Sequence, residues 1–140
     1  MRVIDSRNLN VREDISIHED NGPGRRIAYR GSTCFCDEAD DMTRAGRFAI
    51  EAGKLHGKSV AWIGGGFCLG PRVFAIAECV QTVYEIEPAL EEFCPEGVKF
   101  IPGDWHDTIS GQYDIIVYDL GGEPPTTELT KHLKSSGILI

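Results

Sequence analysis

The stretch Ser59–Gly66, which reads SVAWIGGG, decides the fold of this chain. Its segment Ser59–Ile63 has the continuous apolar character of a strand that is buried on both faces of a parallel sheet. Three glycines follow at once, and glycine lets the backbone turn sharply and approach a ligand closely. The stretch therefore predicts a buried strand that ends in a binding loop.

On the C-terminal side of this stretch, strands and helices alternate. The expected strands are Thr82–Ile86, Val98–Ile101, Asp114–Asp119 and Gly137–Ile140. The expected helices are one that begins at Pro71 and two that span Glu87–Phe93 and Thr126–Leu133. Apolar strands that alternate with helices predict an α/β fold, in which a mostly parallel sheet is covered on both faces.

On the N-terminal side, short strands are expected before a single helix. The expected strands of this small β-hairpin region are Ile15–His18, Ile27–Arg30 and Ser32–Cys36. Asp37 is the expected N-cap of a helix that stops at His56, with a buried face of Met42, Ala45, Ala49 and Ala52. We therefore divide the chain into a hairpin region, residues 1–36, and a core, residues 37–140, within one compact domain.

Composition and charge argue against several classes of protein. The 140 residues include 22 acidic and 14 basic ones, for a formal charge of −8, and 41% are hydrophobic. An acidic balance argues against nucleic-acid partners, which are bound through basic patches. No apolar run reaches the ~20 residues of a membrane span, and the first residues lack the apolar stretch of a signal peptide. We expect a cytoplasmic protein with no nucleic-acid or membrane partner.

The cysteines and histidines do not follow a metal-binding pattern. They are Cys34, Cys36, Cys68, Cys79, Cys94, His18, His56, His106 and His132. No CxxC pair is present, and no two histidines lie four residues apart. Cys34 and Cys36 share one strand face, but no second Cys or His pair of suitable spacing follows them. We expect reduced thiols, no disulfide framework and no metal.

The ends of the expected strands carry the residues of a candidate binding site, because ligands of doubly wound sheets bind at the carboxyl ends of the strands. These residues are Gly64–Gly66, then Glu85 and Glu87, then Gly103 and Asp104, and then Asp119. Glu85 lies 19 residues after Gly66, where an acid can hold two ribose hydroxyls. Taken singly, the glycines are also consistent with a tight turn and the acids with helix caps. Their order favours a nucleoside site, where Trp105 would stack on a base or belong to the core.

Five segments of the sequence resemble spermidine synthases. They are Val60–Arg72, Tyr84–Glu87, Pro102–Asp104, Tyr113–Asp119 and Leu133–Leu139. The resemblance implies the wider class I S-adenosylmethionine-dependent methyltransferase fold, a Rossmann-like core with strand order 3-2-1-4-5. It also implies an adenosyl ligand, either S-adenosylmethionine or a decarboxylated or demethylated relative. Since this chain ends at the fifth strand, the later strands of the family and much of its polyamine pocket are expected to be missing.

The resemblance assigns roles to individual residues. Gly64, Gly65 and Gly66 would contact the methionine portion of the ligand. Glu85 would bind the ribose, and Gly103 and Asp104 would meet the adenine. Asp119 would contact the ligand and, together with Glu123, face the acceptor as a candidate catalytic residue.

Departures from the family pattern narrow the expected reaction. Phe67 replaces the aspartate of the glycine loop, and Cys68 and Leu69 replace its last two glycines. In the catalytic segment, the only acid that stands for the family's second aspartate is Glu123, displaced by one residue. These changes disfavour aminopropyl transfer. They favour methyl transfer to a small acceptor, which two acids would attract as a cationic amine.

Two other functions remain open from the sequence. An altered catalytic loop is also expected of a non-catalytic nucleoside-binding or interaction module. A nicotinamide-dependent oxidoreductase would use the glycines at 64, 66 and 70 with Glu85, although Gly103 and Asp104 favour an adenine clamp. For assembly, the apolar strand Gly137–Ile140 at the sheet edge favours a homodimer, since uncovered strand edges pair with other chains.

Overall fold

The computed structural model describes residues 3–8, 15–20, 25–29 and 33–140, with side chains from residue 37 onward. Its first part is an antiparallel sheet of four strands in chain order: β1 (Val3–Asn8), β2 (Ile15–Asp20), β3 (Arg25–Tyr29) and β4 (Thr33–Asp37). The strand β1 is not predicted from the sequence, because its apolar residues stand together at its start and do not alternate with polar ones.

Some expectations concern residues outside this description. Arg30 and Ser32, the ends of two expected strands, lie outside it, as do the side chains of His18, Cys34 and Cys36. The division of the chain between residues 36 and 37 stays a prediction.

The second sheet has five parallel strands in the order β7-β6-β5-β8-β9. Their bounds are Ser59–Ile63 for β5, Val80–Glu85 for β6, Lys99–Pro102 for β7, Tyr113–Tyr118 for β8 and Leu133–Leu139 for β9. Counted from β5, this is the order 3-2-1-4-5, so the predicted Rossmann-like core with this strand order is confirmed. The strand β9 lies at the edge and pairs only with β8 among the described strands.

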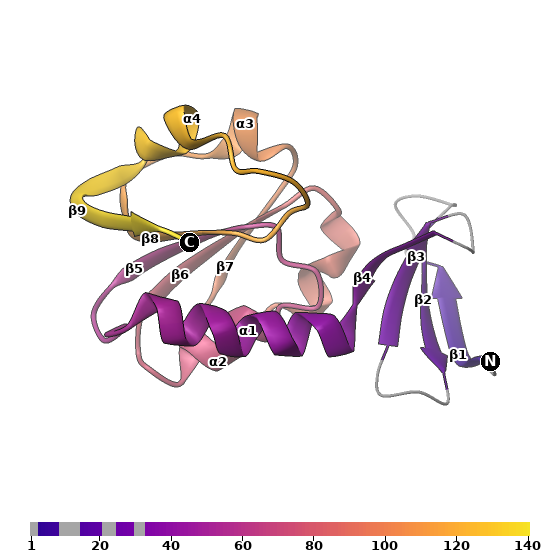
Figure 1. Ribbon diagram of the computed structural model, residues 1–140. Coiled ribbons are helices and arrows are strands. Elements are labelled where there is room, and N and C mark those ends of the chain that lie inside the picture. The colour runs from indigo at the N-terminus through magenta and orange to yellow at the C-terminus, as the bar shows by residue number, and fades with distance from the viewer. Residues whose placement is uncertain (1–2, 9–14, 21–24, 30–32) are drawn as a thin grey trace.

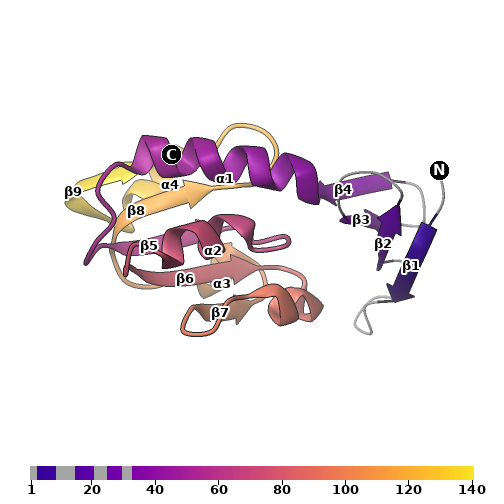
Figure 2. The same cartoon turned by 90° about the horizontal axis from the view of Figure 1, so that it is seen from below.

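Helices cover both faces of this sheet. The helices α1 (Glu38–Ala52) and α2 (Leu69–Ala75) lie on one face, and α3 (Trp105–Thr108) and α4 (Thr126–Thr130) lie on the other (Figures 1 and 2). The core follows the strand period, because Val60 and Trp62 pack in the cluster beside α1, while Ala61 packs in the opposite cluster. In the described part of the chain, no helix is long and apolar enough to cross a membrane.

The helix α1 begins as predicted, but its buried face differs from the prediction. The side chain of Asp37 accepts hydrogen bonds from the N–H groups of Ala39 at 2.9 Å and Asp40 at 3.2 Å, which confirms the N-cap. The buried face consists of Asp41, Ala45, Phe48 and Ala52. The expected place of Met42 was wrong, because its side chain is exposed. A buried acid on this helix is the first sign that α1 contributes to a site.

Other element boundaries differ from the expectations by a few residues. The helix α2 begins at Leu69, which places Pro71 within its first turn, where proline is tolerated. Pro88–Phe93 forms the short 3-10 helix η1. The expected helix Thr126–Leu133 ends at Thr130, and β9 begins at Leu133, four residues before its expected start. The helix α3 was not predicted, because four residues are too short for a visible helical period.

Candidate functional site

The glycine loop after β5 has almost no space for side chains. Gly64 has a φ of +92°, and a Cβ placed on it would lie 2.7 Å from Leu120 Cδ2 and 2.9 Å from the carbonyl oxygen of Asp119. A Cβ on Gly65 would lie 2.7 Å from Val83 Cγ1. Close approach of β6 and of the chain after β8 therefore requires glycine at both positions.

Glu85 ends β6 and joins that strand to the glycine loop. Its Oε1 accepts hydrogen bonds from the N–H groups of Gly65 at 3.1 Å and Gly66 at 3.0 Å, and its Oε2 accepts one from the N–H of Glu87 at 2.9 Å. The side chain is 7% exposed. Three backbone donors thus hold this carboxylate in one place. Glu87 is also buried, but its Oε1 has no hydrogen-bond partner among the described residues.

Asp104 follows β7 and caps the helix α3. Its Oδ1 accepts a hydrogen bond from the N–H of His106 at 3.0 Å and lies 2.7 Å from Nδ1 of the same imidazole. The hydrogen bond between the two side chains lowers the pKa of Asp104 and raises the pKa of His106. Gly103, with a φ of +116°, makes the preceding turn, and its N–H donates to the carbonyl oxygen of Glu85 at 2.9 Å.

A cavity of about 240 Å³ opens between these strand ends. Its lining is Gly64, Tyr84, Glu85, Ile86, Gly103, Asp104, Trp105, His106 and Leu120. Trp105 belongs to the core, which was one of its two expected places, and its ring stacks on His106 at a centroid distance of 3.8 Å. The cavity brings together the residues expected to bind ribose and adenine.

A second cavity of about 120 Å³ adjoins the first and shares Gly64, Glu85, Ile86 and Leu120 with it. Its other lining residues are Asp41, Arg44, Gly65, Gly66 and Asp119. The whole glycine loop and four charged side chains, those of Asp41, Arg44, Glu85 and Asp119, therefore meet in one small space.

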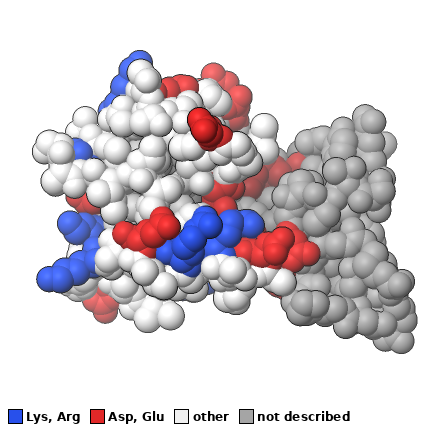
Figure 3. Space-filling model, in the orientation of Figure 1, with Lys and Arg blue, Asp and Glu red and all other residues white. Residues whose placement is uncertain are grey.

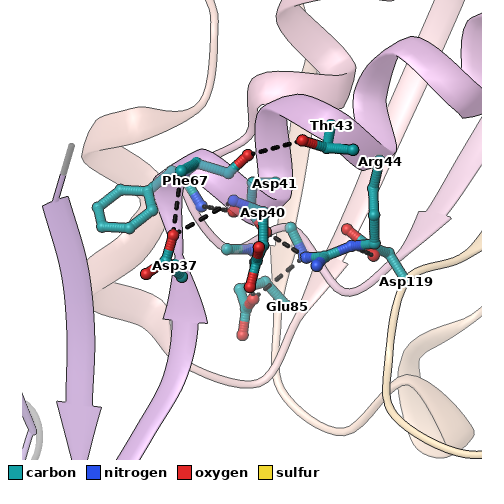
Figure 4. A network of polar contacts seen from close by, with 11 residues as sticks. Asp37, Asp40, Asp41, Thr43, Arg44, Phe67, Glu85 and Asp119 are labelled. Carbon is teal, nitrogen blue, oxygen red and sulfur yellow. Dashed lines mark hydrogen bonds and ion pairs between the residues drawn. The ribbon is translucent and has the colours of Figure 1, made fainter. Parts of the chain in front are cut away.

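Asp119 is not an isolated acid in this second cavity. Arg44 Nε donates to Asp119 Oδ1 at 2.8 Å, and Arg44 also forms an ion pair with Asp41 (Figure 4). Burial raises the pKa of Asp119, and the guanidinium of Arg44 opposes this effect.

Sequence reasoning missed Asp41 and Arg44. The spacing of Asp41, Ala45 and Phe48 was the available signal, because it places a charged residue in line with the buried face of α1.

Glu123 is not part of this arrangement. It is exposed and lines neither cavity, nor the groove of about 580 Å³ that runs from Arg47 past Asp119 to Gly121. Within residues 37–140 and the described strands before them, no three His, Cys, Asp or Glu side chains are arranged to hold a metal ion. The structure thus groups Asp119 with the expected binding residues and separates Glu123 from them.

A parallel sheet in this order, with a glycine loop and acids at its strand ends, is a Rossmann-like fold with its candidate site at the carboxyl ends of the strands. No family model matches the sequence, and no curated protein matches it either. A spermidine synthase from Thermotoga maritima is similar in structure, with a TM-score of 0.72 and 19% identity over 99% of this chain and 56% of that one.

Two methyltransferase structures share the fold. A methyltransferase from Thiobacillus denitrificans, solved with S-adenosyl-L-homocysteine, has a TM-score of 0.60 and 20% identity over 69% of this chain and 46% of that one. A protein-L-isoaspartate O-methyltransferase has a TM-score of 0.57 and 20% identity over 89% and 40% of the two chains. This chain therefore spans about half the length of the structures that it matches.

Proposed function

We propose that this chain binds S-adenosylmethionine, or a decarboxylated or demethylated relative, and acts as a methyltransferase-like protein related to spermidine synthases. Its acceptor would be a small molecule, and the acids at the strand ends favour a cationic amine. The observation that carries the proposal is the position of Glu85. This fixed carboxylate lines both cavities, between the glycine loop on one side and Asp104 on the other.

The larger cavity suits the adenosine half of such a ligand. Each carboxylate oxygen has two acceptor sites, and three of the four are taken by backbone N–H groups, so Oε2 of Glu85 retains one site for a ribose hydroxyl. Asp104 offers an acceptor for the adenine amino group, and Ile86 and Leu120 supply apolar contacts at the mouth. Together, the two cavities reach the lower end of the ~300–1,000 Å³ range of ligand pockets.

In transfer from a sulfonium, the protein mainly binds the ligand and aligns the acceptor with it. When bound, S-adenosylmethionine supplies a carbon activated by its sulfonium, so that attack by an acceptor lone pair breaks the carbon–sulfur bond and leaves that electron pair on sulfur. The glycine loop and Glu85 would orient the ligand. Asp119 and Glu123 remain our proposed acceptor-side residues. A raised pKa brings Asp119 closer to the range in which a base works near neutral pH.

A non-catalytic nucleoside-binding module is the second candidate. Two observations favour it: Glu123 lies away from both cavities, and Asp119 is engaged by Arg44. In either case we propose a cytoplasmic protein that self-associates through the edge strand β9. Light scattering that shows a monomer at micromolar concentration would contradict the self-association.

A ligand screen tests the proposed function. S-adenosylmethionine, S-adenosylhomocysteine, methylthioadenosine and NAD would be compared by thermal shift and calorimetry. A ligand at 100 times its Kd stabilises a protein by ~2.7 kcal/mol, so a true ligand should raise the Tm clearly. Adenosyl compounds should stabilise and NAD should not. Stabilisation by NAD alone would instead indicate the oxidoreductase.

Two variants locate the binding. Asp104→Asn should weaken adenosyl binding, because the side chain lines the larger cavity. Asp107→Asn is the matched control, since Asp107 is exposed on the same short helix and does not line that cavity. Binding followed by no transfer to any of a panel of small amines and alcohols would favour the non-catalytic module. Equal effects of the two variants would place the ligand elsewhere.

A further inference from the structure

We propose that Cys68 and Cys94 are a modification site, where oxidation forms a reversible disulfide that weakens ligand binding at the candidate site. Both are free thiols in the structure. The oxidant would be a small disulfide compound, which exchanges with protein thiols. Formation of the bond is independent of the proposed function, whereas its effect on an adenosyl ligand rests on that function.

The two cysteines lie on segments that pack side by side. Phe67 and Cys68 directly follow the glycine loop, and Phe93 and Cys94 lie at the end of η1. The rings of Phe67 and Phe93 meet edge to face at 5.1 Å between centroids. The next residues along both segments also meet, and the thiol of Cys68 hydrogen-bonds to the sulfur of Cys94. Arg72 Nη2 donates to the carbonyl oxygen of Phe93 at 3.3 Å and ties α2 to η1.

These contacts involve the residues by which the loop departs from the spermidine synthase pattern. Phe67 stands in place of an aspartate, and Cys68 in place of a glycine. Neither lines the two cavities at the strand ends. Both instead pack toward η1, so this thiol pair lies behind the candidate site and not within it.

The two segments that the disulfide would join also hold the carboxylate of Glu85 from two sides. On the loop side, the N–H groups of Gly65 and Gly66 donate to Oε1 at 3.1 and 3.0 Å. On the η1 side, Glu87 caps the 3-10 helix, and its N–H donates to Oε2 at 2.9 Å. A change in the distance between the segments therefore acts on Glu85.

A disulfide would change that distance. Its sulfur atoms lie only about 2.05 Å apart, much closer than two hydrogen-bonded thiols. Cys68 has little room to move, because it is 0% exposed, its N–H donates to the carbonyl oxygen of Gly65 at 2.8 Å, and its Sγ would lie 3.2 Å from a Cβ on Gly65. The movement should therefore fall on η1. It would pass through Glu87 to Oε2 of Glu85, the oxygen that retains a site for a ribose hydroxyl.

Disulfide exchange at this pair has two steps. Cys94 reacts first, because its side chain is half-buried whereas Cys68 is fully buried. Its thiolate attacks the oxidant, whose S–S bond breaks and releases one thiolate. Cys68 then gives its proton to that thiolate and attacks Sγ of Cys94, which expels the second thiolate. Two protein thiols are oxidised, and one small disulfide is reduced to two thiols.

The charges around Cys94 favour a cationic oxidant. Glu91, Glu92 and Glu96 are exposed on the same segment. Along α1, by contrast, basic side chains are bordered by acidic ones on both sides (Figure 3). Cystamine, a cationic disulfide, is therefore the probe, and it should react faster than the anionic glutathione disulfide. Because burial raises the pKa of both thiols, the reaction is run at about pH 8.5.

Mass spectrometry after trypsin cleavage tests the bond. In wild type treated with cystamine, the product should have lost two hydrogens and should join peptide 59–72 to peptide 73–99. The second peptide also contains Cys79, another free thiol, so Cys79→Ser is the matched control. The link should persist in Cys79→Ser, be absent from Cys94→Ala and disappear in dithiothreitol.

Calorimetry with S-adenosylhomocysteine tests the effect on the site. Oxidised wild type should bind this ligand at least ~5-fold more weakly than reduced wild type. Cys79→Ser should show the same difference, and Cys94→Ala should bind equally before and after cystamine treatment. Because coupling is reciprocal, bound ligand should shift the thiol–disulfide equilibrium toward the thiols by the same factor.

A measurement without ligand keeps this inference apart from the proposed function. The amides of Gly65, Gly66 and Glu87 should exchange hydrogen faster in the oxidised protein, because their acceptor Glu85 is displaced. If these amides respond but reduced wild type binds no adenosyl compound, the proposed function fails and the inference stands.

Two results would overturn the inference while binding by the reduced protein still supports the proposed function. One is the absence of a link between the two peptides, or a link that is lost in Cys79→Ser. The other is a link through Cys94 that changes neither amide exchange nor affinity, which would remove the control of the site by this disulfide.

Discussion

The candidate site has an inner wall at Glu85 and an outer wall at Asp104. The same sequence pattern, an acid at the end of a strand, predicts both walls, but the structure builds them differently. Glu85 on the inner wall is 7% exposed and accepts three backbone hydrogen bonds. Asp104 on the outer wall is 51% exposed and is held by its own short helix and by the imidazole of His106. The inner wall joins two segments of the core, whereas the outer wall is locally assembled.

Because of this difference, we expect variants of the two walls to affect different properties, the stability of the fold or the binding of a ligand. A side chain that satisfies buried backbone donors from another segment supports the fold as well as the ligand. A side chain that only caps an exposed helix can change with less effect on the core. We therefore expect variants of the inner wall to lower the free energy of unfolding, and variants of the outer wall to act mainly on binding and on pH dependence.

The largest effect is expected from Glu85→Ala. The change leaves the N–H groups of Gly65, Gly66 and Glu87 without this acceptor, and a buried unsatisfied donor costs ~1–3 kcal/mol. The free energy of unfolding should fall by about 3 kcal/mol or more in urea denaturation. Glu85→Gln, which keeps one oxygen acceptor, should lose less. A loss below ~1 kcal/mol for Glu85→Ala would show that water replaces the carboxylate, and the contrast between the walls would fail.

Gly65→Ala should destabilise the inner wall through crowding. Its Cβ would lie 2.7 Å from Val83 Cγ1 and 3.2 Å from Cys68 Sγ, and overpacking of a core typically costs ~1–3 kcal/mol. Gly46→Ala is the control, since nothing lies within 4 Å of a Cβ in the middle of α1. That control should stabilise the chain by ~0.5–1 kcal/mol. Equal urea midpoints of unfolding for the two variants would contradict the close approach of Val83 and Cys68 to Gly65.

Asp104→Asn should have a smaller effect on stability than Glu85→Gln, because an asparagine oxygen still caps α3. Its effect on His106 should be clear. The aspartate raises the pKa of this imidazole, so the variant should bring the His106 pKa down toward its ordinary value in an NMR titration. An unchanged His106 pKa in the variant would show that the two side chains do not interact in solution.

The smallest expected effect is the pH dependence of the outer wall. Because the folded chain has a raised His106 pKa, the contribution of this group is complete below the unfolded pKa and is lost as the pH rises through the folded one. Because the Asp104 pKa is lowered, its contribution is present above the unfolded value and is lost as the pH falls through the folded one. The pair should therefore stabilise the chain most between the unfolded-state pKa of Asp104 and the unfolded-state pKa of His106. Asp104→Asn should flatten the Tm profile of wild type there.

Much of the fold follows from local patterns. The apolar run Ser59–Ile63 with its three glycines, and the apolar strand expected at Asp114–Asp119, predict a parallel sheet because their side chains suit burial on both faces. The short elements were harder to predict. The helix α3 is a single turn, and β1 has no alternation, so neither carries a period that sequence reasoning can detect.

The candidate site, like the fold, could be predicted from the sequence only in part. By itself, the sequence determined which residues end the strands, because strand ends follow from local hydrophobic pattern, and the positions of Glu85, Asp104 and Asp119 follow from it. Only the tertiary structure decided what those acids contact. Arg44 lies 75 residues from Asp119 in the chain and 2.8 Å from it in space, and the packing of α1 against the sheet places it there. Packing also leaves Glu123 outside, because a contact between distant segments depends on how whole elements dock rather than on spacing within one of them.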